Sequence, residues 1–190
     1  MDIIVTELTK SFAGHIVLDR FSAAFPEGEI TCVMGPSGGG KTTFLHILMG
    51  LMSPDSGTIK GVPSRKSAVF QEDRLCESFS ALTNVRMVLD KSFDCGEIQA
   101  HLDEIGLGKD RTKPVGEYSG GMKRRVALVR AVLADSRILF LDEPLKGLDD
   151  QTKGHVIDYL KKHFNERTVI MVTHDKEEVD AFDARLVTLG

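Results

Sequence analysis

The chain has 190 residues, of which 42% are hydrophobic and 27% are charged, as is usual for a globular protein of one domain. Its formal net charge of −4 gives no general basic field, which argues against nucleic-acid binding. The three cysteines form no CxxC pair and no zinc-ligand spacing, so we expect a reduced, cytosolic setting. With no signal-peptide pattern at the N-terminus and no apolar run near the roughly 18 residues of a membrane span, we expect membrane contact only through a partner.

The predicted elements begin with short strands. Residues 3–8 and 15–25 fit strands of an antiparallel β region, and the second shows a rough alternation of apolar and polar side chains. Residues 30–34 form a short apolar run that fits a buried strand, and a glycine-rich stretch follows it. Residues 41–50 then predict a helix that Gly50 ends.

The chain changes character after a further short strand at residues 67–70. Helical patches at 82–89 and 97–105 are separated by Gly, Asp and Lys, with few β-branched runs. Beyond them the pattern predicts, in chain order, a helix that follows Ser119, a strand at 137–141, a helix at 150–164, a strand at 168–173, a helix at 176–182 and a strand at 185–189.

Strands that alternate with helices in this way predict an α/β fold with a mainly parallel sheet. The helical patches then form an insert in the α/β core. We therefore expect a single domain over residues 1–190, with the core and its β region at 1–71 and 119–190 and a helical subdomain at 72–118.

The glycine-rich stretch GPSGGGKT fits the phosphate-binding pattern GxxxxGK[ST], and it lies between a predicted strand and a predicted helix as that pattern requires. Glycines let successive backbone N–H groups turn toward a phosphate, and the helix N-terminus adds partial positive charge. Lys41 can reach the β- and γ-phosphates, the Thr42 hydroxyl can coordinate Mg²⁺, and Thr43 is expected to assist at the α-phosphate. The predicted nucleotide-binding residues are Gly35, Pro36, Ser37, Gly38, Gly39, Gly40, Lys41, Thr42 and Thr43.

Polar side chains follow three other predicted strands. Asp142 and Glu143 end one strand, His174 a second and Gln71 a third. At the carboxyl end of a parallel strand, Asp142 would face the phosphate loop and hold Mg²⁺. Glu143 could polarise a water for attack on the γ-phosphate, and His174 could contact that phosphate. Gln71 could contact Mg²⁺ or the water. Without the phosphate motif, each group would be an ordinary polar strand end.

The segment SGGMKRRVALV poses a different question. Ser119 is a good N-cap for the helix that follows, because its side-chain oxygen can accept a bond from a first-turn amide. Gly120 and Gly121, however, each cost about 1 kcal/mol relative to Ala inside a helix. Helix stability therefore does not explain the bare backbone at these two positions.

Taken in order, these motifs resemble the ATP-binding cassette (ABC) family over almost the whole chain. The resemblance rests on the Walker A motif GPSGGGKTT, the Q-loop VFQEDRL, the signature YSGGM, the Walker B motif ILFLDEP, the D-loop GLD and the switch-histidine segment VTHD. It implies a RecA-like P-loop NTPase core that binds and hydrolyses ATP with Mg²⁺. The chain is similar to the ATPase subunits of bacterial nitrate, sulfonate and taurine importers.

The resemblance also implies partners. Ser119, Gly120 and Gly121 would contact the γ-phosphate of ATP held by a second cassette, and Asp149 would cross the same interface. Two chains would then close head-to-tail around two ATP molecules, most simply as a homodimer. Phe12 would stack on adenine, although a place in the core fits it equally well. The helical subdomain would receive a transmembrane permease on the inner face of the cell membrane. A solute-binding protein would act indirectly, and no nucleic acid is expected.

Three residues depart from the family pattern. Tyr118 replaces the common Leu of the signature, Met122 replaces Gln, and Lys146 occupies a D-loop position where a small residue is common. Arg124 and Arg125, further along the signature helix, are interpreted as a solvated basic face.

Two other functions remain open from the sequence. A soluble cassette without a transporter is one, although no long coiled-coil insert separates the Walker motifs here. A regulatory subunit that no longer hydrolyses ATP is the other. The intact Lys41, Glu143 and His174 argue against the second, while the altered D-loop favours it.

Overall fold

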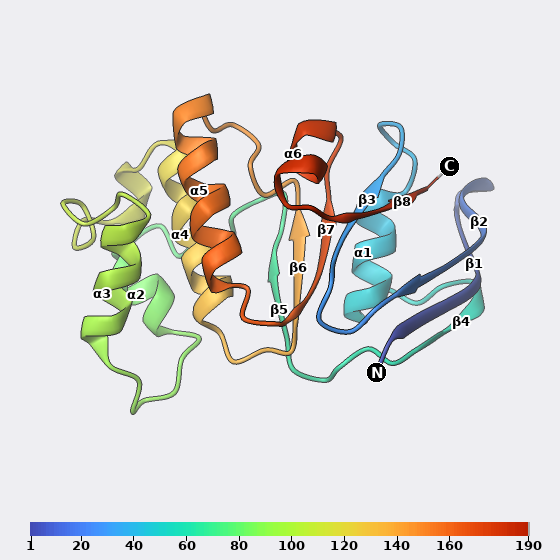
Figure 1. The fold of residues 1–190 in the computed structure, drawn as a ribbon, viewed down its shortest axis with the longest axis horizontal. Coiled ribbons are helices and arrows are strands. Elements are labelled where there is room, and N and C mark those ends of the chain that lie inside the picture. The colour runs from blue at the N-terminus through green and yellow to red at the C-terminus, as the bar shows by residue number, and fades with distance from the viewer. Residues whose placement is uncertain (190) are drawn as a thin grey trace. The chain divides into compact units, whose positions relative to one another are not determined.

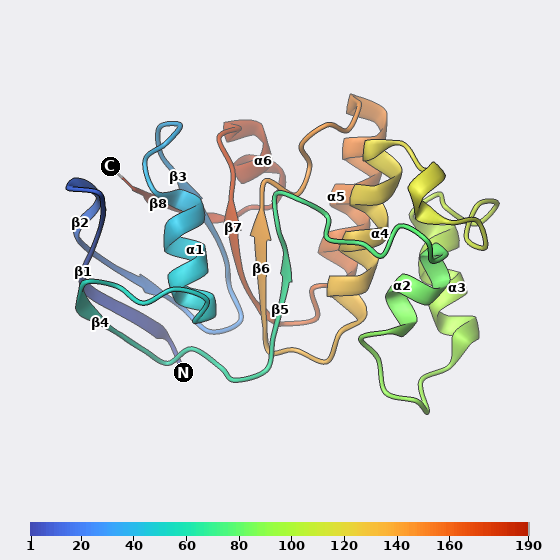
Figure 2. The ribbon, with the colours of Figure 1, turned by 180° about the vertical axis from the view of Figure 1, so that it is seen from behind.

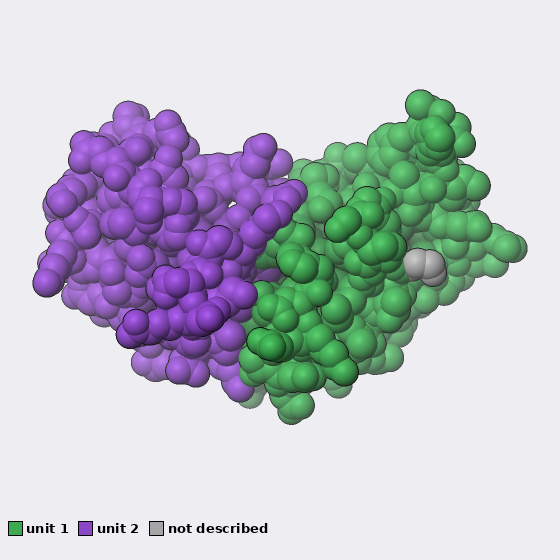
Figure 3. Space-filling view, turned by 90° about the horizontal axis from the view of Figure 1, so that it is seen from above, with its two compact units in different colours: residues 1–66, 136–143, 166–190 green, residues 67–135, 144–165 purple. Residues whose placement is uncertain are grey.

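The structure, a computed structural model, describes residues 1–189 and divides the chain into two compact units (Figure 3). Unit 1 comprises residues 1–66, 136–143 and 166–190, and unit 2 comprises residues 67–135 and 144–165. Strand β5 (Lys66–Val69) begins where unit 1 passes into unit 2. Unit 2 thus includes more of the chain than the helical subdomain predicted from the sequence, whose bounds stay a prediction.

An antiparallel sheet forms the N-terminal part of unit 1, in the order β2-β1-β4. Its strands are β1 (Ile3–Phe12), β2 (His15–Phe25) and β4 (Ser56–Lys60). Ala13 and Gly14 join β1 to β2, and both have a positive φ, 48° and 83°, as a tight hairpin turn requires. The antiparallel region is therefore confirmed, and its first strand runs on to Phe12.

Parallel strands form the second part of unit 1, in the order β6-β7-β3-β8. They are β3 (Ile30–Met34), β6 (Ile138–Asp142), β7 (Thr168–Val172) and β8 (Arg185–Thr188). Helix α1 (Lys41–Met49) packs against β6 and β7, and α6 (Lys176–Ala181) lies on the other side of the strands (Figures 1 and 2). Because both faces are covered, every residue of β6 and β7 is buried. The predicted parallel sheet is confirmed, and its strands share one carboxyl edge.

Unit 2 is mainly helical. Its elements are α2 (Ala81–Arg86), α3 (Cys95–Glu104), a short 3-10 helix (Val115–Glu117), α4 (Gly120–Leu133) and α5 (Asp150–His163). Helix α4 contacts α2, α3 and α5, so its residues 126–129 are buried in succession instead of on one stripe. The four α-helices correspond to the predicted patches at 82–89 and 97–105, the helix after Ser119 and the helix at 150–164.

Candidate nucleotide-binding site

The loop between β3 and α1 is built on glycines that the fold itself requires. Gly38 and Gly40 have φ values of 76° and 84°, in the left-handed region that favours glycine. A Cβ on Gly40 would lie 2.7 Å from the Val17 carbonyl oxygen, and one on Gly35 would lie 2.2 Å from the Leu189 carbonyl oxygen. At Gly40 and Gly35 the loop backbone therefore passes against β2 and the residue after β8 with no room for a side chain, whereas a Cβ on Gly38 would meet open space. The glycines at 35 and 40 thus have a steric cause that comes from other segments of the chain.

The N-terminus of α1 differs from those of the other described α-helices. The others are capped by a side chain that accepts a hydrogen bond from the first turn, and the capping residues are Ser80, Asp94, Ser119, Asp149 and Asp175. Gly40, the N-cap of α1, makes no such bond. The first-turn amides of α1 and the positive end of its dipole are thus left without a side-chain cap, as an anion-binding helix end requires.

Lys41 lies at this helix end and is only 8% exposed. Its Nζ donates hydrogen bonds to the Gly35 carbonyl at 2.8 Å and the Pro36 carbonyl at 2.9 Å. An ammonium group carries three N–H donors, and these carbonyls account for two of them. The loop therefore holds the cation in place with donor capacity for a phosphate oxygen.

The predicted acid and histidine meet at the carboxyl edge of the parallel strands. Asp142 ends β6 and is buried, and the next residue, Glu143, has a φ of 48°. A left-handed conformation costs a residue with a side chain on the order of 1–2 kcal/mol. Glu143 Oε1 lies 3.4 Å from His174 Nδ1, and the His174 side chain is 65% exposed. The structure thus brings Glu143 and His174 together, with His174 on the solvent side.

Two residues that sequence reasoning missed support the turn that carries His174. Thr173 Oγ1 donates to Glu178 Oε2 at 2.7 Å, and this pair is buried. The Asp175 amide in turn donates to Thr173 Oγ1 at 3.1 Å. The available signal was a Thr directly before His174 and a Glu four residues after it, within the short helix α6.

The signature residues stand at the start of α4 in unit 2. Ser119 is the N-cap, and its Oγ accepts a hydrogen bond from the Met122 amide at 3.3 Å. A Cβ on Gly121 would lie 3.2 Å from Leu148 Cδ2, so packing within unit 2 favours glycine there. A Cβ on Gly120 would meet no described heavy atom within 4 Å beyond its own helix backbone and chain neighbours. Packing within residues 1–189 therefore does not explain Gly120.

Local contacts explain some of the residues that depart from the family pattern. Tyr118 is buried, its hydroxyl donates to the Asp110 carbonyl, and burial followed by the charge of Asp110 raises the pKa of Tyr118. Its polar end therefore points into unit 2. Met122 is half-buried in the first turn of α4, and Lys146 is exposed. Asp149 caps α5 by accepting from the Thr152 amide at 2.9 Å and the Thr152 hydroxyl at 2.7 Å.

The interpretation of Arg124 and Arg125 as a solvated basic face was wrong. Arg124 is 5% exposed, and its guanidinium donates to the carbonyls of Phe70 and Gln71, both at 2.6 Å. Its Nε also lies 3.2 Å from Asp73 Oδ1. Arg125 donates to the Ile105 carbonyl at 2.9 Å, and burial lowers its pKa. These side chains turn inward because carbonyls at the ends of β5 and α3 need donors.

Two further predicted residues, Gln71 and Phe12, are exposed. Gln71 has an exposed side chain, while its backbone carbonyl is one of those held by Arg124. Phe12 is 43% exposed at the end of β1, and Lys10 Nζ lies 5.5 Å from its ring centroid. The alternative that Phe12 belongs to the core is therefore wrong.

Comparisons with known proteins identify the family. The family description "ABC transporter" matches residues 18–146. An aliphatic sulfonates import ATP-binding protein of Frankia alni is 36% identical over 98% of this chain and 76% of its own length. A retinal-specific phospholipid-transporting ATPase of Mus musculus is 33% identical over 99% of this chain, which spans 9% of that protein. A bacterial ABC transporter cassette solved as a dimer matches with a TM-score of 0.86 and 26% identity, over 98% of this chain and 94% of the other.

The fold and the glycine-rich loop define a P-loop NTPase, and the chain belongs to the ABC transporter family. It is an ATPase domain of that family. The sequence prediction of family, fold and ATPase activity is confirmed.

Proposed function

We propose that this chain is the ATPase subunit of a membrane importer and that it works as a head-to-tail dimer with two shared ATP sites. The proposal of a dimer rests on one observation. Gly120 lies at the exposed start of a helix, and no described residue of the chain occupies the space that a side chain at this position would fill. A γ-phosphate approaching from a second copy would need that space. Ser119, Gly120 and Gly121 of one chain would then face ATP held by the other, with Asp149 at the same interface.

Within one chain, the loop from Gly35 to Thr43 would bind the ATP phosphates. The N-terminus of α1 offers its amides, and Lys41 offers its ammonium to the β- and γ-phosphates. Phe12, exposed at the end of β1, would stack on adenine. We infer these roles from the identity of the motifs and from their order along the chain.

Glu143 would act as the general base for hydrolysis. Its carboxylate accepts a proton from a water, the water oxygen bonds to the γ-phosphorus, and the bond to the bridging β-γ oxygen breaks to release ADP and phosphate. His174, within 3.4 Å of Glu143, would contact the γ-phosphate from the solvent side. Gln71 would help to place the water.

The donor set also fits Mg²⁺, which prefers oxygen ligands. Asp142 is a buried carboxyl group at the end of β6, and Thr42 places a hydroxyl at the start of α1. Both come from the carboxyl edge of the parallel strands, and Gln71 would supply a third oxygen. When bound, Mg²⁺ would neutralise charge that develops on the β- and γ-phosphates.

A membrane partner completes the proposal. Among residues 1–189 no helix has the length and apolar character needed to cross a bilayer. The relatives named above carry out sulfonate import and phospholipid transport, and the similarity to the import proteins extends over most of their length. By analogy with these relatives, the chain would lie on the inner face of the cell membrane, against a permease that contacts the helical subdomain at 72–118, with a solute-binding protein acting through that permease.

Separate experiments test the catalytic role of Glu143 and the sharing of each ATP site between two chains. Glu143→Gln should abolish ATP turnover while ATP drives the variant into a dimer during gel filtration, and normal turnover would remove Glu143 from the base role. Lys41→Ala and Gly120→Asp should each be inactive alone. Their mixture should regain activity, because mixed dimers contain one site with no defect. Full activity of either variant alone would contradict a model in which two chains form each ATP site together. Co-purification with an integral membrane protein tests the transporter role separately.

A further inference from the structure

Three side chains with metal-binding atoms meet in unit 2, outside the residues assigned to ATP. His101 and Glu104 lie one turn apart on α3, and His163 lies at the end of α5. One ligand atom of each lies within 4.8 Å of the others. Glu104 Oε2 is 3.0 Å from His163 Nε2, and the rings of His101 and His163 have centroids 4.5 Å apart. Two segments distant in sequence therefore present two imidazoles and a carboxylate to one point.

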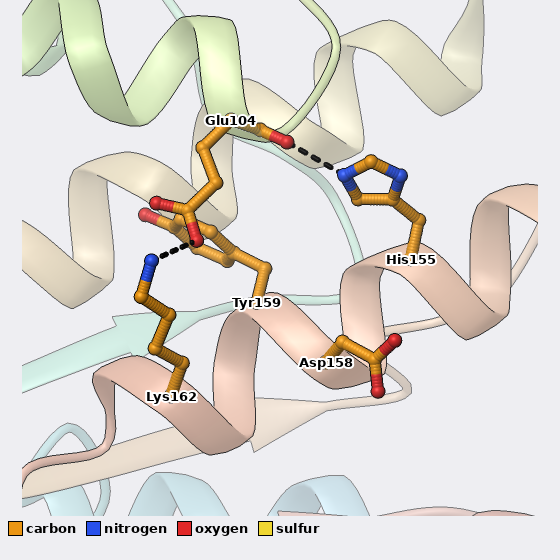
Figure 4. A pocket seen from close by; sticks show the side chains of 5 residues that line it. All are labelled: Glu104, His155, Asp158, Tyr159 and Lys162. Atoms are coloured by element: carbon orange, nitrogen blue, oxygen red, sulfur yellow. Dashed lines mark hydrogen bonds and ion pairs between the residues drawn. The ribbon is translucent and has the colours of Figure 1, made fainter.

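Neighbouring groups hold these side chains in position. His101 Nδ1 is 2.9 Å from the hydroxyl of the buried Tyr159, and His155 Nε2 is 2.6 Å from the Glu104 carbonyl. Figure 4 shows Glu104 on α3 directed toward α5, where His155, Tyr159 and Lys162 surround it. Hydrogen bonds to the groups around a ligand fix its orientation, which is the usual second layer of a metal centre.

One neighbouring cation competes with a metal ion for Glu104. Lys162 opposes a cation, with Nζ 2.9 Å from Glu104 Oε1, but its side chain is 64% exposed and can turn into solvent.

We propose that His101, Glu104 and His163 bind a divalent transition-metal ion of the zinc class. Two imidazole nitrogens and one carboxylate oxygen are typical zinc ligands, whereas Mg²⁺ and Ca²⁺ prefer oxygen alone. A pocket of 360 Å³, lined by Glu104 and by four residues of α5, adjoins one of the three ligands, so a water can approach the ion from the Glu104 side. Coordination requires the three ligand atoms to draw closer together than they lie now, and the half-buried side chains can do so by rotation. The ion would join α3 to the last turn of α5.

Zn²⁺ and Co²⁺ are the probes. The full chain, without nucleotide or affinity tag, should bind one Zn²⁺ per chain by calorimetry at this site, and Co²⁺ should give the visible absorption of a four-coordinate centre. Zn²⁺ should also raise the melting temperature, because a ligand that binds only the folded state stabilises it. Glu104→Gln and His163→Ala should each weaken Zn²⁺ binding at least about 100-fold, beyond the usual effect of an outer-layer change. His163→Gln replaces His163→Ala if the latter fails to fold.

Matched variants exclude other metal ligands. His155→Ala removes a histidine that contacts Glu104 at its backbone carbonyl and not at its carboxylate, so Zn²⁺ should still bind, weakened by less than about 100-fold. His174→Ala and the double change Cys76→Ser, Cys95→Ser should also keep the site. Lys162→Gln should bind Zn²⁺ more tightly, because a competing cation is gone. Absence of Zn²⁺ binding by the parent chain would overturn the proposal. So would unchanged binding in both Glu104→Gln and His163→Ala.

Discussion

Arg124 provides the sharpest stability test of the structure. Arg124→Gln removes a buried guanidinium that donates to the carbonyls of Phe70 and Gln71 and pairs with Asp73. Removing one partner of a buried ion pair costs about 3–5 kcal/mol, since the other charge stays desolvated. The Asp73 side chain retains 20% exposure, which favours the lower end, about 3 kcal/mol. For a chain of this size, that free energy corresponds to a fall of about 6–12 °C in melting temperature.

The pH dependence of this loss in stability tests whether Asp73 is the carboxylate that loses its partner. Burial raises the pKa of Asp73, and the charges of Arg124, Arg130 and Lys123 act against that rise. Without Arg124 the pKa of Asp73 in the folded state rises further above its unfolded value. A carboxyl group with a raised folded pKa favours folding below that pKa, and its contribution is lost as pH increases through it. The gap between parent and variant should therefore be smaller at pH 5 than at pH 7.5.

Thermal melts and urea titrations at both pH values measure these effects. Arg185→Gln is the matched control, because Arg185 is an exposed arginine on β8 and its loss should change the free energy of unfolding by less than about 0.5 kcal/mol. A fall in melting temperature under about 2 °C for Arg124→Gln would refute the buried network. An equal gap at both pH values would show that Asp73 is not the group left unpaired.

Two further substitutions separate folding from function. Gly120→Ala should leave the melting temperature unchanged or raised, because the added methyl meets open space and Ala favours the helix by up to about 1 kcal/mol, yet ATPase activity should fall about tenfold or more. Parallel melts and phosphate-release assays decide this, and full activity would show that no partner approaches Gly120. Tyr118→Phe should cost about 0.5–1.5 kcal/mol in urea titrations, since the half-buried Asp110 carbonyl loses one of two donors and keeps the Lys113 amide. An unchanged urea midpoint would contradict that bond.

Much of unit 1 could be predicted because its signals are local. The run ILFLD predicts a buried strand and GPSGGGKT predicts a tight loop, and both patterns can be recognised within a few consecutive residues. The meeting of Glu143 with His174 also followed, because parallel strands bring their carboxyl ends to one edge.

The arginines and the histidine cluster could not be predicted for the opposite reason. Arg124 turns inward to reach carbonyls that lie 53 and 54 positions away in the chain. His163 meets Glu104 across a separation of 59 residues. A single sequence shows that these side chains are polar, but the partner that makes burial favourable appears only when distant segments pack.

The left-handed backbone at Glu143 sets stability against activity at a single residue. Gly or Asn adopts a φ of 48° with less strain than Glu, so selection for stability alone would replace Glu at this position. In the proposed reaction, however, only a carboxylate here can take the proton from water. A stabilising redesign guided by backbone preference would therefore select against the residue that we propose as the general base.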